Sequence, residues 1–432
     1  MNISNLKEIV VEHKKALVRF DGLIDREVLQ ARDRLIASKE VIVITGVRRS
    51  GKSSLMKLIA RDLLSSGVSD SNLLYINFDD DRLISFSIED FEDLLSAYLE
   101  LCNPDGKKYF FLDEIQNVPL WEKWVNRLYE LEDVKIFVTG SNSSMLSSEY
   151  STLLTGRNSQ IINYPFSFSE HLAIANVKFA DNDLFDKNNT ISIKRELGNY
   201  YDLGGFPEVV KNKDLYLLEQ YFKDIIYRDI IVKNGIKQSV EVREMAIILA
   251  SESSSLQTYN RLKNLLGVKS QVSIKNYMSN FADSYLFFPL SLFSYSVKQQ
   301  IYNPKKIYCV DTGLARAVSF ASSENEGRRY ENIVFLELLR RNEEIYYWKS
   351  ASDKEVDFII KKGTAPMSAI QVAIDIGNVE TKNREFEALV CAYNELGIRD
   401  LKVLTKDEEY RAVYKEVKIE VIPIWKYLIL NK

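Results

Sequence analysis

The sequence has 432 residues, of which 46% are hydrophobic and 27% are charged, and its formal net charge is −4. Because a single hydrophobic core rarely extends over so many residues, we expect two to four domains. The apolar fraction is typical of a globular protein. The slight negative charge excludes a basic field over the whole molecule, so any surface for nucleic acid must be local.

Cysteine and histidine are scarce. Cys102, Cys309 and Cys391 are far apart and form no CxxC pair, which indicates a reducing cytoplasm and argues against a disulfide framework or a zinc site. With His13 and His171 as the only histidines, a histidine-rich metal site is excluded and a Ser-His triad is disfavoured. The N-terminal residues lack the apolar core of a signal peptide, and no apolar run reaches the roughly 20 residues of a membrane helix, so we expect no membrane partner.

The first part of the chain alternates between strand-like and helical segments. A helical pattern at 27–38 precedes the first strand, and further strands then recur between helices. Such alternation predicts a parallel sheet whose two faces are covered. The expected strands are 41–45, 73–78, 109–112, 135–139 and 160–164, and the helices between them include 53–64 and 121–131.

A glycine-rich turn at 46–53, called the phosphate turn below, separates the first expected strand from the next helix. Gly46 and Gly51 enclose four residues, and Lys52 and Ser53 follow, which is the pattern G-x-x-x-x-G-K-[ST]. The glycines let successive N–H groups face one phosphate, and the helix adds its positive end. Lys52 would reach the terminal phosphates and the Ser53 hydroxyl would bind Mg²⁺, so we predict a site for ATP and Mg²⁺. The predicted binding residues are Gly46, Val47, Arg48, Arg49, Ser50, Gly51, Lys52, Ser53 and Ser54.

Two carboxylates come directly after the apolar run at 109–112. Asp113, at a strand end beside the phosphate turn, would hold Mg²⁺ through water, and Glu114 would orient and polarise a water molecule. A solvated acidic pair at a strand end is the alternative, and for the pair alone we would prefer it. Together with the phosphate turn, the pair predicts catalysis.

Polar residues also follow the expected strand at 135–139. In the sequence TGSNSS, Ser141 or Asn142 would lie between the two sites and contact the γ-phosphate or the attacking water. A serine-rich turn without a ligand explains either residue nearly as well. Asn77, late in its strand, would hold Glu114 in an inactive pose.

The pattern changes near Pro165. Residues 173–250 are mostly helical, and residues 255–288 indicate short helices joined by turns. From about residue 301 the sequence returns to strands around one helix at 330–341. These later strands are expected at 307–310, 345–348, 356–360, 369–373 and 401–404.

The segment 255–280 is locally cationic. It contains Arg261, Lys263, Lys269 and Lys275 and no acidic residue. Its apolar spacing predicts a helix, a glycine turn and a second helix, the arrangement of helix-turn-helix modules. Four cations would contact a few phosphates of double-stranded DNA, with weak and salt-sensitive affinity. The alternative is a small helical domain that only packs against its neighbour.

A set of short motifs together resembles the prokaryotic AAA+ ATPase family that carries a C-terminal domain of unknown function. The motifs are ITGVRRSGKSSL, FFLDEIQNV, VTGSNSSML, LLTGR, YPFSFSEHL, LGGFPEVV, IYRDII and KKIYCVDTGL. The resemblance implies an α/β fold in four parts and no settled biological role. The implied parts are an AAA+ P-loop ATPase core at 1–170, a helical lid at 171–250, a winged-helix-like module at 251–298 and a C-terminal α/β restriction-endonuclease-like domain at 299–432.

The resemblance also implies roles for two arginines. Arg157, in LLTGR, lies where such ATPases carry an arginine that contacts the γ-phosphate across a subunit boundary, which implies a homo-oligomer. A surface ion pair is the alternative. Arg228, in IYRDII, would be a sensor in the lid or would pair with Asp224 or Asp229.

A nuclease-like final domain would need carboxylates that hold Mg²⁺ and a lysine that assists the attacking water. Glu331 and Asp357 are the candidate carboxylates, but Gln371 and Ala373 occupy the positions of the third acid and the lysine. We therefore expect a nuclease-like fold that serves in binding or assembly without catalysis. No signal in the sequence selects a substitute lysine; the candidates are Lys361 and Lys382.

These features predict a cytoplasmic ATPase that hydrolyses ATP to ADP and phosphate with Mg²⁺. It would couple its nucleotide state to DNA or to a partner through the C-terminal modules. A slow nucleotide-gated switch that recruits a protein partner is the alternative from another class. A third hypothesis, an ATP-regulated nuclease, is weakened by Ala373.

Overall fold

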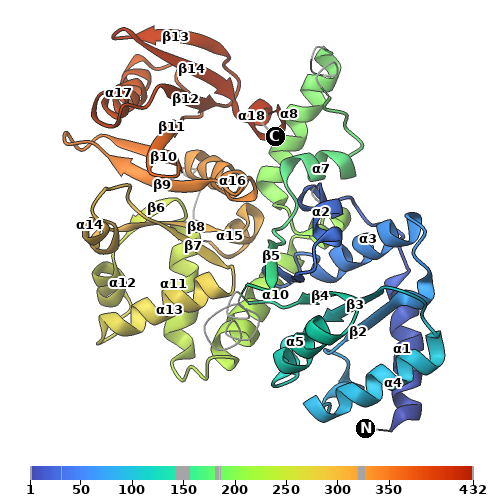
Figure 1. The fold of residues 1–432 in the computed structure, drawn as a ribbon. Helices are drawn as coiled ribbons and strands as arrows, with labels where there is room; N and C mark the ends of the chain where they lie inside the picture. The colour runs from blue at the N-terminus through green and yellow to red at the C-terminus, as the bar shows by residue number, and fades with distance from the viewer. Residues whose placement is uncertain are drawn as a thin grey trace. The chain divides into compact units, whose positions relative to one another are not determined.

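The computed structural model of the chain describes residues 2–30, 32–142, 156–180, 184, 186–319 and 326–430. The chain divides into two units, Met1–Tyr164 and Pro165–Lys432, each with its own helices and sheets (Figure 1). It is therefore a mixed α/β protein, as the sequence predicted.

Parallel strands form the sheet of the first unit. The strands are β1 (Val41–Thr45), β2 (Leu73–Asn77), β3 (Lys108–Asp113), β4 (Val134–Thr139) and β5 (Asn158–Ile162). Their order is β2-β3-β4-β1-β5, and each neighbouring pair is parallel. The predicted strands are confirmed with small shifts at their ends, because each apolar run is long enough to be recognised without its partners.

Helices cover both faces of this sheet. Consecutive strand residues point to opposite faces, so Val41 and Val43 pack with α1, α4 and α5, while Ile42 and Ile44 pack with α3. Burial on both faces explains the continuous apolar runs of these parallel strands. The helices are α1 (Ile3–Leu17), α2 (Arg32–Ala37), α3 (Lys52–Ser65), α4 (Phe91–Cys102) and α5 (Trp121–Leu131). The helix expected at 27–38 is a 3₁₀ turn, Glu27–Leu29, followed by α2.

The second unit begins with a helical region, as the sequence predicted. One more helix that packs with this region, α15 (Thr312–Val318), comes later in the chain, after the small sheet described below. The helices of the region are α7 (Phe168–Ile174), α8 (Lys187–Leu203), α9 (Pro207–Asn212), α10 (Tyr216–Asp224), a π-helical segment (Ile225–Val232) and α11 (Ser239–Ser251).

A small antiparallel sheet follows, in the order β6-β8-β7. The sequence predicted short helices joined by turns at 255–288, with a wing or core strand at 285–290 that β7 confirms, and it assigned the strand at 307–310 to the last section. This strand, β8, pairs with β6 and β7 and so belongs to the small sheet. Antiparallel strands can pair although they are distant in sequence, so the sequence alone did not reveal the partners of β8. The elements are β6 (Ser255–Gln257), α12 (Tyr259–Leu265), α13 (Gln271–Asp283), β7 (Phe287–Leu290), α14 (Val297–Tyr302) and β8 (Lys305–Cys309).

The last section forms a larger mixed sheet in the order β13-β14-β12-β11-β10-β9. Phe358 and Ile370 pack on the face covered by α16, and Ile359 and Ala369 pack on the face covered by α17. The elements are α16 (Glu326–Arg340), β9 (Glu344–Lys349), β10 (Glu355–Lys362), β11 (Ala365–Val372), α17 (Val379–Leu396), β12 (Asp400–Thr405), β13 (Tyr410–Tyr414), β14 (Val417–Pro423) and α18 (Ile424–Leu430).

Two glycine-containing motifs, LGGFPE and VDTGL, meet inside the second unit. The Asp311 carboxylate accepts hydrogen bonds from the N–H groups of Gly205 (2.6 Å) and Leu314 (2.8 Å). Burial raises the pKa of Asp311 to about 6. A Cβ atom on Gly313 would lie 2.3 Å from the carbonyl oxygen of Leu203. These motifs therefore pack the end of α8 against the start of α15.

We expect Gly313→Ala to destabilise the second unit by about 1–3 kcal/mol, because the added Cβ forces two closely packed backbones apart. Gly198→Ala is the matched control within α8, since a Cβ there meets no heavy atom within 4 Å. Alanine in a helix interior is more favourable than glycine by about 0.5–1 kcal/mol, so the control should gain stability. Urea unfolding measures both, and wild-type stability of Gly313→Ala would contradict this packing.

Candidate functional site

The turn between β1 and α3 has the backbone shape that its glycines allow. Gly46 has a φ of 143°, and a Cβ atom there would lie 2.3 Å from the carbonyl oxygen of Asn163. Arg49 and Gly51 are left-handed, with φ of 68° and 93°. Helix α3 begins at Lys52 with no side chain capping its N-terminus. The N–H groups of its first turn therefore have no partner within the helix or from a cap, as an anion site requires.

Lys52 is buried against this turn. Its Nζ donates hydrogen bonds to the carbonyl oxygens of Gly46 (3.2 Å) and Val47 (3.4 Å). The same Nζ lies 3.9 Å from Oε1 of Glu114. The lysine predicted to contact phosphates and the predicted catalytic carboxylate are therefore neighbours. Ser53 and Ser54 follow in the first turn of α3, and both are half-buried.

Two residues that the sequence analysis missed support the turn from outside. Asn163 follows β5 and donates from Nδ2 to the carbonyl oxygen of Ser50 (2.9 Å), while its N–H donates to the carbonyl of Thr45 (2.7 Å). Arg26 donates to the same Ser50 carbonyl (3.3 Å) and to the carbonyl of Tyr164 (2.6 Å). No local sequence signal marks either residue, because each is far from the turn along the chain.

Asp113 and Glu114 lie at the carboxyl end of β3, anchored by Thr139 at the end of β4. The Thr139 hydroxyl donates to Oδ1 of Asp113 and accepts from the N–H of Glu114 (2.9 Å). Tyr75 on β2 donates from its hydroxyl to Oδ2 of Asp113 (2.9 Å). Burial and the Asp113 carboxylate raise the pKa of Tyr75 well above its usual value, so the hydroxyl remains a donor. Both oxygens of Asp113 thus have a fixed partner.

Gln116, and not Asn77, contacts the carboxylate of Glu114. Nε2 of Gln116 donates to Oε2 of Glu114 at 2.5 Å. The side-chain oxygen of Asn77 instead accepts the N–H of Asp79 at 3.0 Å. Among the described residues Asn77 makes no hydrogen bond to Glu114, so the expectation that Asn77 holds this carboxylate is not met.

Strand β4 lies between β1 and β3, so the residues after it face both sites. Ser141 and Asn142 are buried there, directly after the N–H of Gly140 donates to the carbonyl of Ile44 (3.1 Å). The strand order is consistent with the predicted position between the phosphate turn and the carboxylates, and contact with a γ-phosphate or a water molecule stays a prediction. The motifs TGSNSS and LLTGR extend into 143–155, which lie outside the described residues.

Arg157 lies at the amino-terminal end of the parallel strands, opposite the end that carries the phosphate turn. Its carbonyl accepts the N–H of Val41, the first residue of β1, at 2.9 Å. The phosphate turn follows the last residue of the same strand, so the strand length separates the two. The guanidinium pairs with Glu130 (2.7 Å) and with Asn126 on α5. In its own subunit Arg157 therefore forms the surface ion pair that was the alternative.

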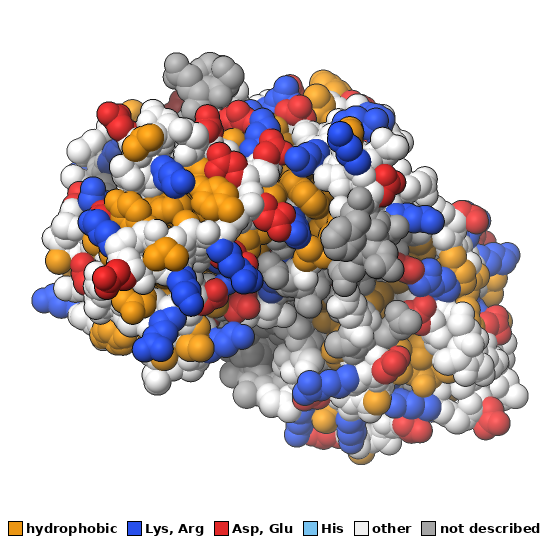
Figure 2. All heavy atoms as spheres, turned by 90° about the horizontal axis from the view of Figure 1, so that it is seen from above, with side chains coloured by type: hydrophobic (Ala, Val, Ile, Leu, Met, Phe, Trp, Pro, Cys, Tyr) orange, Lys and Arg blue, Asp and Glu red, His pale blue; other side chains and the backbone are white. Residues whose placement is uncertain are grey.

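The cationic segment of the second unit has fewer free charges than its sequence suggested. Arg261 makes two hydrogen bonds to Glu252, of 2.6 and 2.7 Å. Within the part of the chain that the structure describes, no ion pair involves Lys263, Lys269 or Lys275. Figure 2 shows a different face of the molecule, where cations and anions are mixed with apolar patches between them. The candidate surface is therefore reduced to three lysines.

The candidate residues of the last section come partly together. Glu331 and Asp357 both contact the ammonium of Lys306, at 2.8 and 2.7 Å. Oε1 of Gln371 accepts the N–H of Asp357 at 3.2 Å. Ala373 is buried, and its N–H donates to the carbonyl of a neighbouring strand. The sequence analysis missed Lys306, because that residue lies 25 positions before the first candidate carboxylate, Glu331.

The lysines considered as substitutes lie elsewhere. Lys361 pairs with Glu344 at 2.6 Å. The Nζ of Lys382 lies over the ring of Tyr410, 4.9 Å from its centre. Arg228 is exposed and lies 3.8 Å from Asp224, one of the pairings that the sequence left open.

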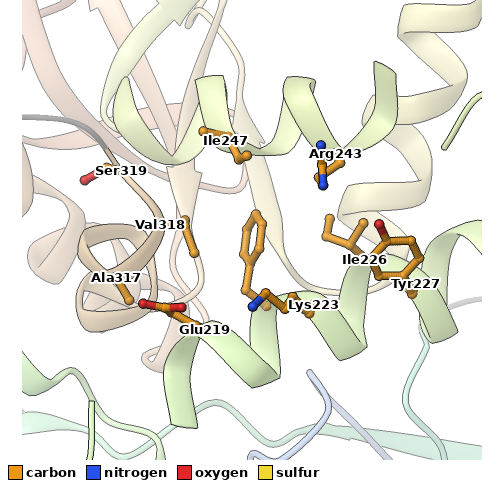
Figure 3. Close-up of a pocket in the computed structure, with 10 residues that line it drawn as sticks. Glu219, Lys223, Ile226, Tyr227, Arg243, Ile247, Ala317, Val318 and Ser319 are labelled. Carbon is orange, nitrogen blue, oxygen red and sulfur yellow. The ribbon is translucent and has the colours of Figure 1, made fainter. Parts of the chain in front are cut away.

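A separate cavity of about 320 Å³ lies within the second unit, between α10, the π-helical segment, α11 and α15 (Figure 3). Ile226, Ile247 and Val318 form apolar parts of its lining, and Lys223 and Arg243 add cations from the two facing helices. None of the nucleotide-site residues predicted from the sequence belongs to this cavity. Among the described residues, no helix has both the length and the apolar character needed to cross a membrane.

Family models match three consecutive parts of the chain. Residues 38–172 match an AAA domain, residues 194–325 match a domain of unknown function (DUF8612), and residues 326–427 match a second one (DUF4143). The first match contains the phosphate turn, Asp113, Glu114 and Arg157. The chain is thus a protein with an AAA domain followed by domains of unknown function.

Two relatives match over most of their length. The uncharacterized protein MJ1544 of Methanocaldococcus jannaschii is 35% identical over 415 residues, which are 91% of this chain and 89% of that protein. An uncharacterized protein of Haemophilus influenzae is 33% identical over 347 residues, 77% of this chain and 82% of that protein. The chain therefore belongs to the same protein family as MJ1544.

Solved structures resemble the chain only distantly. The Aeropyrum pernix Orc1 protein, solved in complex with DNA, is 11% identical and covers 71% of this chain and 95% of its own, with a TM-score of 0.31. The Thermotoga maritima RuvB Holliday junction branch migration motor is 12% identical and covers 66% and 88%, with a TM-score of 0.28. Likeness at this level does not identify a ligand or partner.

We expect Thr139→Val to destabilise the first unit by roughly 2–4 kcal/mol, because it leaves Oδ1 of Asp113 and the N–H of Glu114 buried without a partner. Thr139→Ser keeps the hydroxyl and should lose at most about 1 kcal/mol, for one methyl group. Guanidinium unfolding compares the two variants. Equal losses would mean that the methyl group, and not the hydroxyl, stabilises this junction.

Proposed function

We propose that the chain is an ATPase that binds ATP with Mg²⁺ and hydrolyses it to ADP and phosphate. The observation that carries the proposal is the position of β4, which brings the turn at 46–53 and the pair Asp113–Glu114 to one edge of the sheet. The match of residues 38–172 to an AAA domain supports it independently.

The residues fit a triphosphate with its metal. The uncapped start of α3 and the glycine turn offer N–H donors, and Lys52 offers a cation beside them. In this proposal Ser53 binds Mg²⁺ directly, Asp113 binds it through water, and the other residues of 46–54 contact phosphates. The bound metal supplies Lewis-acid stabilisation of phosphate charge.

Two polar residues would act on the water and the γ-phosphate. Glu114 has a hydrogen-bonded backbone but a partly exposed carboxylate, so it is suited to orient water and accept a proton. Asn142, after β4, would contact the γ-phosphate or that water. Its position between β1 and β3 supports this role.

We propose that Arg157 acts on the site of a neighbouring copy. Within its own subunit it lies at the opposite edge of the sheet, beside the first residue of β1. Only another copy of the chain would therefore bring this guanidinium to a γ-phosphate. This assignment requires a homo-oligomer and makes hydrolysis depend on assembly.

We further propose that the second unit couples the nucleotide state to double-stranded DNA. Its parts would be a helical lid at 171–250, a winged-helix-like module at 251–298 and an inactive restriction-endonuclease-like domain at 299–432. The order α11, β6, α12, α13, β7 and β8 supports a winged-helix-like arrangement that extends slightly past both boundaries. Lys263, Lys269 and Lys275 would contact phosphates.

A slow nucleotide-gated switch remains the second candidate. The 2.5 Å hydrogen bond from Gln116 to Glu114 favours it, because a carboxylate held by a neighbouring amide is less available to a water molecule. The two candidates differ in turnover rate and in the effect of DNA.

Lys52→Ala should abolish binding of Mg·ATP, because it removes the cation that faces the terminal phosphates. Glu114→Gln should keep binding and lower turnover by about 10²–10⁴-fold, as expected for loss of a general base. Calorimetry measures binding, and phosphate release measures turnover. Wild-type turnover in Glu114→Gln would refute its assigned role.

Lys7→Ala is the matched control for these variants. Lys7 forms an exposed ion pair with Glu100 at 2.6 Å, far in sequence from the turn. Such pairs contribute about 0–1 kcal/mol, so binding and turnover should both stay at wild-type values.

Turnover per subunit should rise with protein concentration, because each site needs Arg157 from another copy. Duplex DNA should raise the rate further. Arg157→Ala should lose the concentration dependence but keep Mg·ATP affinity. The triple variant Lys263→Ala/Lys269→Ala/Lys275→Ala should lose only the DNA stimulation. The measurement is the ATPase rate against concentration, with and without DNA.

Arg127→Ala is the control for Arg157→Ala, since Arg127 on α5 pairs with Glu92 at the surface. It should behave as wild type. A slow rate that is independent of both concentration and DNA would contradict the coupled ATPase and favour the switch.

A further inference from the structure

A buried ammonium with three carboxylates around it lies inside the second unit. Nζ of Lys306 contacts Oε1 of Glu331 (2.8 Å), Oε1 of Glu355 (2.9 Å) and Oδ1 of Asp357 (2.7 Å). The Asp357 contact is a hydrogen bond, and the contacts with Glu331 and Glu355 are close ion pairs. Lys306 is 3% exposed, and a buried charge of this kind is tolerated only when it is paired.

The carboxylates around Lys306 are held by further donors. The Tyr308 hydroxyl donates to Oε1 of Glu331 at 2.6 Å, and the N–H of Val372 donates to Oδ2 of Asp357 at 2.9 Å. Burial raises the pKa of Glu331 to about 8, and the nearby Asp357 carboxylate adds to this shift. Lys306 holds a raised pKa despite its burial, because the same carboxylates surround it.

The cluster connects two parts of the second unit. Lys306 and Tyr308 belong to β8, the central strand of the small sheet. Helices α12 and α13 lie between the other two strands, β6 and β7, along the chain. Glu355 and Asp357 belong to β10 of the larger sheet, and Glu331 belongs to α16. A single side chain therefore joins the small sheet to the larger one through charge-assisted hydrogen bonds.

We propose that the Lys306 ammonium is a built-in cation at the position where a nuclease would hold Mg²⁺ between Glu331 and Asp357. In this proposal the domain at 299–432 has no nuclease activity and is called the inert platform. The contacts of Lys306 form a joint that fixes the small sheet to the larger sheet of this platform. A nuclease site must admit a phosphate and a water molecule, whereas Lys306, Glu331 and Asp357 are 3%, 7% and 6% exposed. The proposal is independent of nucleotide binding in the first unit.

Unfolding of the full chain tests the joint. Lys306→Met keeps the length of the side chain but leaves buried carboxylates unpaired, so the melting temperature of the second unit should fall by roughly 6–20 °C. The double variant Lys306→Met/Asp357→Asn should melt above Lys306→Met, because one of those charges is removed. If Lys306→Met gives no folded protein, the double variant decides: recovered folding supports the joint, and failure to recover overturns it.

Lys305→Met is the matched control on the same strand. Lys305 donates to Ser291 at 3.1 Å and to a backbone carbonyl, and it is only half-buried. Its variant should melt within a few degrees of wild type. An unchanged melting temperature in Lys306→Met, or no gain in the double variant, overturns the proposal.

A cleavage assay tests the inert platform in the wild-type protein. Linear duplex DNA incubated with the full chain and Mg²⁺ or Mn²⁺ should stay intact. Metal-dependent cleavage that is lost in Asp357→Asn and in Lys306→Met would overturn the proposal, and it would make Lys306 a catalytic lysine. ATP binding by the same samples shows separately whether the proposed nucleotide function holds.

Discussion

The first unit depends on the hydrogen bonds that place β4 between β1 and β3. Because these parallel strands share a carboxyl edge, the phosphate turn, Thr139 and the pair Asp113–Glu114 meet there. The Thr139 hydroxyl then completes the junction, as it donates to Asp113 and accepts from the N–H of Glu114. Without this order, a glycine turn and an acidic pair would be two unrelated surface features.

Buried charges organise both units by different means. In the first unit, Asp113 takes two hydroxyl donors, while the carboxylate of Glu114 stays partly exposed beside Lys52. In the second unit, three carboxylates lie within 2.9 Å of the Lys306 ammonium. A polar cluster with exposed, incompletely paired groups can bind a ligand, whereas a buried cluster whose charges are all paired stabilises the fold. This contrast explains why catalysis is assigned to the first unit and a platform to the second.

Motifs that identify a family need not be functional. LGGFPE and VDTGL contribute to the resemblance, yet in the fold they bring Gly205 and Gly313 against Asp311 and Leu203. A glycine at a close backbone contact and a buried aspartate that caps a helix are packing requirements. The match to MJ1544 covers 91% of this chain, so it extends over both units.

The sequence by itself determined the strand-and-helix alternation, the phosphate turn and the acidic pair, because each is a pattern within a few neighbouring residues. It also predicted that Ser141 or Asn142 lies between the phosphate turn and the acidic pair. Only the tertiary structure decided that Gln116, and not Asn77, contacts Glu114, that Arg157 lies at the far edge, and that β8 pairs with the small sheet. It alone brought Asn163 to the phosphate turn and Lys306 to its carboxylates. These partners are distant along the chain, and burial and hydrogen bonding select them without leaving a local pattern.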